Sequence, residues 1–211
     1  RRQRQMCIRD RIVTATYVTS LPGSYAIQRR ASKCNGYQDL CNRKYSNVTH
    51  IGAHDSFAVG KLGSLGSNQE ANVTVQLEDG IRLLQIQTHA SSGHQDSNPS
   101  GLSLCHTSCA LKNGGTLESY LRQVKQFLDQ NKNEIVTLVI TNPDNKPVSN
   151  FAKAFENTGL NSMAYRANSN SISKNDWPTL QELISQNQRV VVFLDYKADC
   201  LLYTSDAADE E

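Results

Sequence analysis

Hydrophobic positions along the chain follow two different spacings. Short runs rich in Val, Ile and Leu read as strands, because β-branched and apolar side chains favour an extended backbone. Between these runs, apolar residues recur every three or four positions, which is the spacing of one helix face. The alternation of the two patterns predicts an α/β fold with a largely parallel sheet. The predicted strands are residues 48–52, 81–87, 102–106, 135–141 and 189–195.

Three helices are predicted between and after these strands. The clearest has Thr116 at its N-cap, because a threonine side chain can accept a hydrogen bond from a free amide of the first turn. A second is predicted over residues 148–157, before Gly159, and a third starts at Trp177-Pro178. The apolar positions of the first helix are Leu117, Leu121, Val124 and Leu128.

Two of the predicted strands are almost entirely apolar. Residues 135–141 and 190–194 contain few polar side chains, as expected of strands that are covered on both faces. This pattern favours a parallel α/β sheet or barrel. No apolar run reaches the roughly 18 residues that a membrane-spanning helix needs, so no such helix is predicted.

Two histidines that end apolar runs are the strongest chemical signal. His54 stands in the segment IGAHDS, next to Asp55, and His106 ends the segment LCH. In parallel barrels the chemistry lies where strands end, and His89 and Asp195 also fall at predicted strand ends. Histidine exchanges protons near neutral pH, so a pair can cleave a phosphodiester by general acid/base catalysis. A lone strand-end histidine more often faces water, and the prediction therefore rests on the pair.

The two ends of the chain are set aside from the fold. Residues 1–11 and 200–211 resemble translated sequencing-library adapter; a basic arm and an acidic tail are the alternative. Residues 12–33 are predicted to be a lead-in, either the remnant of a signal peptide or an ordinary flexible segment. The net charge is +2, which does not indicate a nucleic-acid partner.

Cysteines and sequons favour a secretory route. Four cysteines allow three pairings, and the close spacings favour Cys34 with Cys41 and Cys105 with Cys109. The triplets that begin at Asn47 and Asn72 are candidate glycosylation sites, which matter only in a secreted chain. Together they predict a secreted or cell-surface protein with disulfide bonds.

Four segments, in their order and spacing, carry a resemblance to a known family. They are residues 46–56 (SNVTHIGAHDS), 79–85 (DGIRLLQ), 104–109 (LCHTSC) and 133–138 (NEIVTL). The chain resembles the X-domain of phosphatidylinositol-specific phospholipase C, and more narrowly the secreted fungal branch of phospholipase C-like phosphodiesterases. The resemblance covers residues 34–199.

That resemblance implies a TIM-type (β/α) barrel that is truncated after about its fifth strand. Such a fragment would have open edges at residues 48–52 and 189–195, so we expect it to be insoluble or molten when expressed alone.

The resemblance also implies roles for three residues. His54 would take a proton from an inositol hydroxyl, which attacks the phosphorus. His106 would protonate the leaving diacylglycerol oxygen. Asp55 would tune and orient this acid/base pair. The implied substrate is a phosphoinositide or a glycolipid anchor at a membrane surface.

The chain departs from the family pattern at the positions that balance phosphate charge. Gln85 and Gln87 stand where the family has calcium-binding carboxylates, or a carboxylate and an arginine. Either Thr141 or Asn142 stands where a basic residue is common. No metal cofactor is therefore expected. By strand alternation Arg82 should point away from the two glutamines.

Substrate binding is accordingly expected from Gln85, Gln87 and His89, with Lys197 as a further candidate ligand. Losing a charged phosphate partner typically costs a few kcal/mol of transition-state stabilisation.

Two alternatives to an efficient phosphodiesterase remain. The first is a catalytically weak or inactive barrel that binds lipid head groups or a cell surface. The second is a metal hydrolase, for which few acidic ligands and no known motif are present. Its candidate ligands are His50, His54, His89, His94 and His106.

Overall fold

The computed structural model describes residues 4–5, 31–61, 63–91, 98–167 and 171–198. Most of the predicted lead-in, the adapter-like ends apart from Arg4–Gln5, and His94 lie outside these residues. Within the described chain a seven-stranded sheet has the order β1-β7-β6-β3-β4-β5, and β2 also pairs with β3. The strands are β1 Arg4–Gln5, β2 Gly52–Ala53, β3 Leu83–Ala90, β4 Leu102–Cys105, β5 Asn113–Thr116, β6 Val136–Thr141 and β7 Val190–Leu194.

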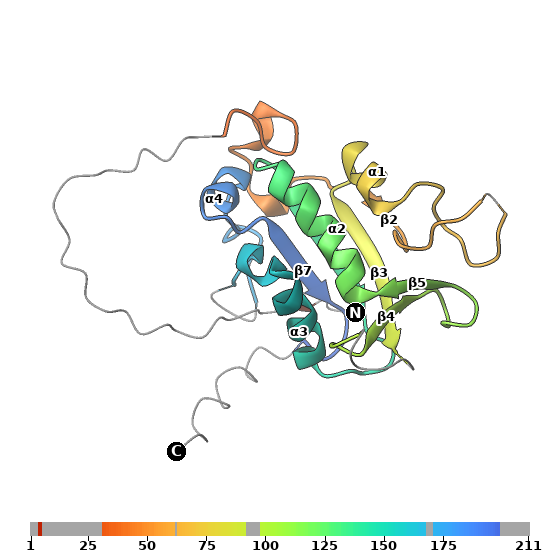
Figure 1. The fold of residues 1–211 in the computed structure, drawn as a ribbon. Coiled ribbons are helices and arrows are strands. Elements are labelled where there is room, and N and C mark those ends of the chain that lie inside the picture. The colour runs from red at the N-terminus through yellow and green to blue at the C-terminus, as the bar shows by residue number, and fades with distance from the viewer. Residues whose placement is uncertain (1–3, 6–30, 62, 92–97, 168–170, 199–211) are drawn as a thin grey trace, which may run out of the picture.

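Helices cover one face of this sheet. The helices α2 and α3 lie across the sheet in Figure 1, over the buried side chains of β3, β6 and β7. On β3 the alternation is regular: Leu84 and Ile86 are fully buried under the helices, whereas Gln85 and Gln87 are half-buried on the other face. The helices are α1 Val73–Glu78, α2 Leu117–Gln130, α3 Val148–Thr158 and α4 Leu180–Ser185, with short 3₁₀ turns at Gln38–Leu40, Tyr45–Asn47 and Leu160–Met163.

The sheet is mixed, which corrects the prediction of a largely parallel sheet. Strands β2, β3, β6 and β7 are parallel, as expected, but β4 runs antiparallel to β3 and β5 antiparallel to β4. The connection from Ala90 to Leu102 is shorter than the dozen or more residues that a parallel crossover usually takes. His106 therefore does not lie at the carboxyl end of a parallel strand.

The predicted helices agree with the structure except at one start. Thr116 caps α2 by accepting a hydrogen bond from the Ser119 amide at 3.1 Å, and Gly159 ends α3 in the left-handed region. The third helix begins at Leu180 and not at Trp177-Pro178, because the capping residue is Thr179. Its side chain and that of Glu182 form a reciprocal capping box.

The predicted strand over residues 48–52 is mostly wrong. Only Gly52–Ala53 pairs with β3, and the apolar side chain of Ile51 is 64% exposed. The strand β5 was not predicted, because Gly114-Gly115 reads as a turn. A side chain at Gly114 would collide with the ring of Phe57, so glycine is required where β5 passes that ring.

The outer edge of β7 is paired, whereas we expected it to be open. Arg4 and Gln5 pair antiparallel with Leu194 and Phe193. Free amide and carbonyl groups along a strand edge accept any extended segment, whatever its side chains, so the sequence of residues 4–5 gave no sign of this pairing.

Candidate active site

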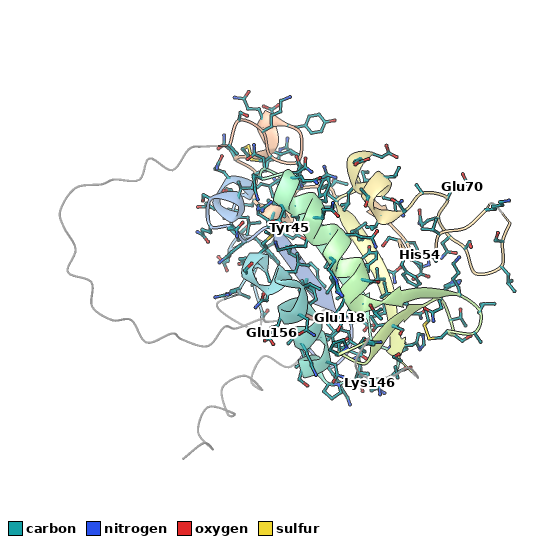
Figure 2. All side chains as sticks on the ribbon, viewed as in Figure 1. Tyr45, His54, Glu70, Glu118, Lys146 and Glu156 are labelled. Atoms are coloured by element: carbon teal, nitrogen blue, oxygen red, sulfur yellow. A yellow bond between two sulfur atoms is a disulfide. The ribbon has the colours of Figure 1, made fainter. Side chains whose placement is uncertain are left out.

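The two histidines predicted to form a pair meet at one edge of β3. Strand β6 occupies the other edge along Leu83–Gln87, so β2 and β4 share the remaining one. Because β2 runs parallel to β3 and β4 runs antiparallel, the two strands approach each other from opposite ends. His54 directly follows β2 and His106 directly follows β4. Figure 2 shows His54 on the side of the molecule where β2 and the β4–β5 hairpin lie.

One carboxylate oxygen joins the two histidines. Oδ2 of Asp55 lies 3.4 Å from Nε2 of His54 and 3.4 Å from Nε2 of His106. The same oxygen accepts a hydrogen bond from Nδ2 of Asn68 at 3.2 Å. The Asp55 side chain is 4% exposed, whereas His54 is 73% exposed and His106 26%. A buried carboxylate therefore holds together two imidazoles that both reach solvent.

Both histidine loops are also tied to β3 by glutamine side chains. The amide N–H of Asp55 donates to Oε1 of Gln85 at 2.7 Å, and the amide N–H of Thr107 donates to Oε1 of Gln87 at 2.8 Å. The residues predicted to bind substrate thus lie next to both histidines. In the described chain their acceptor oxygens already have backbone partners.

The loop of residues 59–69 closes the side of this cluster. Gln69 donates from Nε2 to the His54 carbonyl at 2.7 Å, and Lys112 donates to the Val59 carbonyl. The sequence analysis missed Asn68, Gln69 and Lys112. Asn68 and Gln69 in the Gly/Ser-rich loop, and Lys112 in the turn between β4 and β5, carry no periodic signal, so nothing in the sequence singled out these three.

A third histidine has its own carboxylate. Nδ1 of His89, at the end of β3, lies 3.1 Å from Oδ1 of Asp144. Oδ2 of Asp144 accepts the Ala90 amide at 2.7 Å, and this hydrogen bond is the largest cause that lowers the pKa of Asp144. Nε2 of His89 is buried and has no hydrogen-bond partner among the described residues. Asp144 was missed, although it closely follows the predicted strand 135–141.

The serine after Asp55 anchors the first loop in the core. The Ser56 hydroxyl is hydrogen-bonded to the hydroxyl of Tyr120 on α2, and its carbonyl accepts from Nε2 of Gln76 at 2.9 Å. Burial raises the pKa of Tyr120 well above its ordinary value. Helix α2 therefore supports the His54 loop from beneath with a neutral phenol.

Several other candidates lie away from the histidine cluster. Arg82 points away from the two glutamines, as predicted, and its Nε donates to Glu134 at 2.8 Å. Lys197 donates to the Asn145 carbonyl, and Asn142 bonds the Lys146 and Tyr196 carbonyls. The polar atoms of Arg82, Asn142 and Lys197 thus bond other residues of the fold.

Of the candidate metal ligands, His54 and His106 meet at Asp55, but His50 and His89 have other contacts and His94 lies outside the described residues. The His50 ring packs against Tyr45 in a tilted arrangement with ring centroids 4.9 Å apart, and burial lowers the pKa of this histidine. In the described residues no group of three His, Cys, Asp or Glu side chains is placed to hold a metal ion.

The disulfides pair as the sequence suggested. Disulfides join Cys34 to Cys41 and Cys105 to Cys109. The second encloses His106 in a short covalent loop. The candidate glycosylation residues Asn47 and Asn72 are both exposed.

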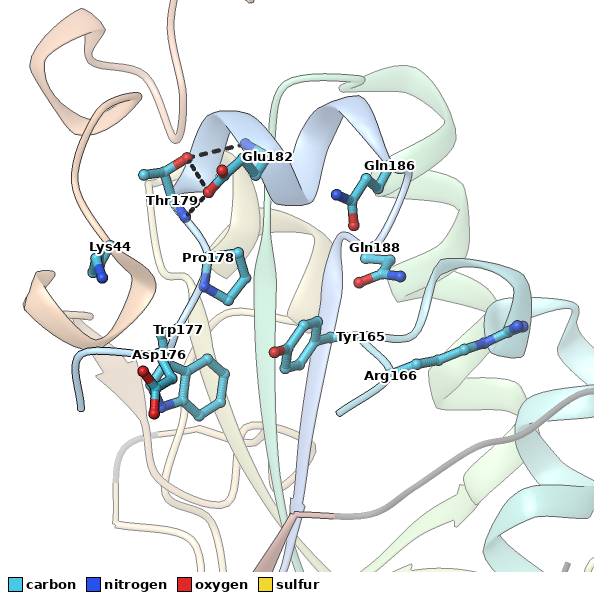
Figure 3. A pocket seen from close by; sticks show the side chains of 10 residues that line it. All are labelled: Lys44, Tyr165, Arg166, Asp176, Trp177, Pro178, Thr179, Glu182, Gln186 and Gln188. Atoms are coloured by element: carbon cyan, nitrogen blue, oxygen red, sulfur yellow. Dashed lines mark hydrogen bonds between the residues drawn. The ribbon is translucent and has the colours of Figure 1, made fainter. Parts of the chain in front are cut away.

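A separate cavity of about 480 Å³ lies at the amino-terminal ends of the parallel strands (Figure 3). Among the side chains that line it are Trp177 and Gln188, the latter just before β7. None of the predicted site residues lines it. The histidine cluster, which follows the carboxyl end of β2, is a different place in the fold.

With the fold and the cluster described, the chain can be compared with known proteins. The family model described as PI-PLC X 1 matches residues 40–206. The chain therefore belongs to the PI-PLC X domain family, which confirms the resemblance noted in its motifs.

Two relatives from Arthroderma benhamiae are each 45% identical to the chain. One is an uncharacterised secreted protein, matched over 79% of this chain and 36% of its own length. The other is PI-PLC X domain-containing protein 1, matched over 79% of this chain and 52% of its own length. The chain thus spans about half or less of the fungal relatives that it matches.

Solved structures share the fold at lower identity. Phosphatidylinositol-specific phospholipase C from Staphylococcus aureus, in an F249X mutant form, is similar with a TM-score of 0.54 and 17% identity. The match covers 73% of this chain and 50% of that one. The phosphatidylinositol-specific phospholipase C from Listeria monocytogenes gives a TM-score of 0.52 over 74% of this chain and 54% of that one. In the described part of the chain, no helix is long and apolar enough to cross a membrane.

Proposed function

We propose that this chain carries the two-histidine centre of a phosphoric diester hydrolase of the phospholipase C type. The observation that supports it most is the position of Asp55 Oδ2, 3.4 Å from Nε2 of both His54 and His106. Each ring nitrogen lies the same distance from one oxygen, so the two imidazoles are close enough to flank a single phosphate. General acid/base catalysis needs that arrangement.

In the proposed reaction, Nδ1 of the exposed His54, the ring nitrogen that is not directed at Asp55, removes the proton of an inositol hydroxyl. The hydroxyl oxygen then attacks the phosphorus and forms a cyclic phosphodiester. The bond from phosphorus to the diacylglycerol oxygen breaks, and this oxygen takes a proton from His106. Each proton transfer contributes on the order of a hundredfold or more to the rate. Asp55 stabilises the imidazolium formed at either histidine.

Substrate binding is assigned to polar groups on β3. The Nε2 groups of Gln85 and Gln87 have no hydrogen-bond partner among the described residues, and neutral amides can donate to phosphate or inositol oxygens. His89 adds a ring nitrogen whose orientation Asp144 fixes. No metal cofactor is included, because uncharged side chains stand where calcium ligands would be needed.

The setting of the reaction is part of the same proposal. We place the mixed sheet in a TIM-type barrel, of which this chain supplies the first strands, and the substrate in a membrane surface as a phosphoinositide or glycolipid anchor. A secreted or cell-surface location agrees with the two disulfides and with the description of one fungal relative as a secreted protein.

Phosphorus NMR of phosphatidylinositol incubated with the full-length protein tests this function. We expect a cyclic inositol phosphate signal with and without chelator, and its loss in His54→Ala and in His106→Ala. His50→Gln, outside the cluster, is the histidine control and should retain turnover. Turnover that persists in both alanine variants would contradict the mechanism.

A second candidate is a head-group binding domain with little or no turnover. The observation that favours it is the absence of charge on Gln85 and Gln87, because neutral donors stabilise a developing phosphate charge less than arginine or a cation does. A folded wild-type protein that binds phosphatidylinositol vesicles but gives no phosphorus signal would support this candidate.

A further inference from the structure

The residues that follow the two histidines share an unusual conformation. Asp55 and Thr107 both have positive φ, +42° and +63°. Residues other than glycine adopt this left-handed region rarely and at an energetic cost, so surrounding contacts must stabilise the conformation. At both positions the chain turns away from β3 directly after a candidate catalytic histidine.

The same two residues are held by the same kind of contact. The amide of Asp55 donates to Oε1 of Gln85 at 2.7 Å, and the amide of Thr107 donates to Oε1 of Gln87 at 2.8 Å. These bonds begin where regular strand pairing stops: β2 ends at Ala53 and β4 at Cys105. At the first break the Gln85 side chain adds to a backbone bond, because the Ser56 amide also donates to the Gln85 carbonyl at 3.0 Å. At the second break the Gln87 side chain provides the hydrogen bond to the loop.

We propose that Gln85 and Gln87 are positioning residues that set the separation of His54 and His106. The two glutamines are neighbours on one face of β3, two residues apart, which is a spacing of about 6.5–7 Å along a strand. Strand β3, which pairs with β6 along Leu83–Gln87, thereby acts as the common support of both histidine loops. The chemical consequence rests on the proposed function; the hydrogen-bond device does not.

In both glutamine side chains it is the amide oxygen that bonds the loop. Oε1 faces the loop backbone, so one lone pair of the acceptor that a cation would need is already engaged, whereas the donor Nε2 has no partner among the described residues. The glutamines thus differ from a pair of metal-binding carboxylates in geometry as well as in charge. Positioning and phosphate contact by Nε2 are compatible, because they use different atoms.

Amide hydrogen exchange in the full-length protein measures the device itself. Gln85→Met keeps the length of the side chain but removes its acceptor, so the Asp55 amide should exchange roughly tenfold faster, while Thr107 changes little. Gln87→Met should give the reverse pattern. Gln85→Glu and Gln87→Glu keep an acceptor oxygen and should restore protection. Unchanged protection in both methionine variants would overturn the proposal.

Turnover of phosphatidylinositol by the same variants measures its consequence. Each methionine variant should lower kcat on the order of tenfold or more with a smaller change in KM, because misplacement of a general acid or base weakens the chemical step. The matched control is Gln186→Met, which should keep wild-type kcat. Gln186 is exposed and lies at the C-cap of α4.

Faster exchange with unchanged kcat would show that the bonds do not position the histidines and would overturn the proposal. If the wild type lacks turnover, the proposed function fails. Amide hydrogen exchange alone then decides whether Gln85 and Gln87 hold the two histidine loops.

Discussion

Asp55 and His106 come from separate loops, yet the carboxylate oxygen of one lies 3.4 Å from Nε2 of the other. The strand directions explain this contact. Because β4 runs antiparallel to β3, its end returns toward the middle of β3, where the loop after β2 already lies. A parallel β4 would place His106 at the far end of the sheet. The antiparallel hairpin is therefore the element that assembles the candidate site.

Replacing the carboxylate of Asp55 by an amide of the same size tests the contribution of its charge. Asp55→Asn keeps the size of the side chain, the backbone amide bonded to Gln85, and a residue type that tolerates positive φ. We expect turnover to fall about a hundredfold or more, because neither imidazolium then has an anionic partner. Phosphorus NMR of phosphatidylinositol hydrolysis, with thermal unfolding of each sample, measures the effect.

The control for this variant is another aspartate that pairs with a cation. Asp129→Asn removes a surface partner of Lys125, at 2.6 Å on α2, and should leave turnover unchanged. An Asp55→Asn protein that is folded and fully active would contradict the role given to Asp55.

The disulfide around His106 should matter more for turnover than the other disulfide. Joint replacement of Cys105 and Cys109 by alanine opens the loop that carries His106, at a cost of about 2 kcal/mol in stability by the chain-entropy relation. Joint replacement of Cys34 and Cys41 is the matched control, with a similar expected cost.

We expect both double variants to have a lower Tm, but a strong loss of kcat only in the first. Equal kcat in the two, at matched stability, would show that the covalent loop does not hold His106 in place.

Prediction from sequence succeeded where one element dictates its own pattern. Helix α2 has a long apolar face and a capping threonine, β7 is apolar throughout and β6 is mostly apolar, so the predicted and observed bounds nearly coincide. The prediction of a strand over residues 48–52 was mostly wrong. The apolar residue Ile51 is exposed, and a local sequence pattern does not show which apolar residues are buried.

The candidate site was predictable in its members but not in its assembly. His54, Asp55 and His106 were found from chemistry and resemblance, but the direction of β4 is not encoded in its own four residues. The hydrogen bond from Thr107 to Gln87 depends on that direction, so this contact with the His106 loop could not be foreseen from alternation alone.

Glycosylation tests the expected secretory route. Oδ1 of Asn72 caps α1 by accepting the Val75 amide at 3.0 Å, which leaves Nδ2 for attachment of a glycan. Asn72→Asp keeps the cap oxygen and removes the sequon. In a secretory host we expect the mass of this variant to drop by one glycan without loss of Tm. Asn47→Asp serves as the comparison at the other exposed sequon, and equal masses for wild type and both variants would argue against modification.

The carboxylate of Asp144 should give the region around His89 a defined pH dependence. The Ala90 amide is the largest cause that lowers the pKa of Asp144 below its ordinary value of 3.8. A depressed pKa contributes stability that is present above 3.8 and is lost as the pH falls through the lower folded value.

Asp144→Asn removes this contribution and weakens the hold on His89. Wild type should therefore be more stable than the variant near neutral pH, and the difference should shrink once the pH falls well below 3.8. Denaturant unfolding of both proteins, near neutral pH and well below pH 3.8, measures this difference in the free energy of unfolding. Asp129→Asn, whose carboxyl also has a lowered pKa but contacts no histidine, is the control for titration alone. If Asp144 acts through His89, only Asp144→Asn should also shift the His89 ring signals in NMR spectra near neutral pH, and unshifted signals would contradict that role.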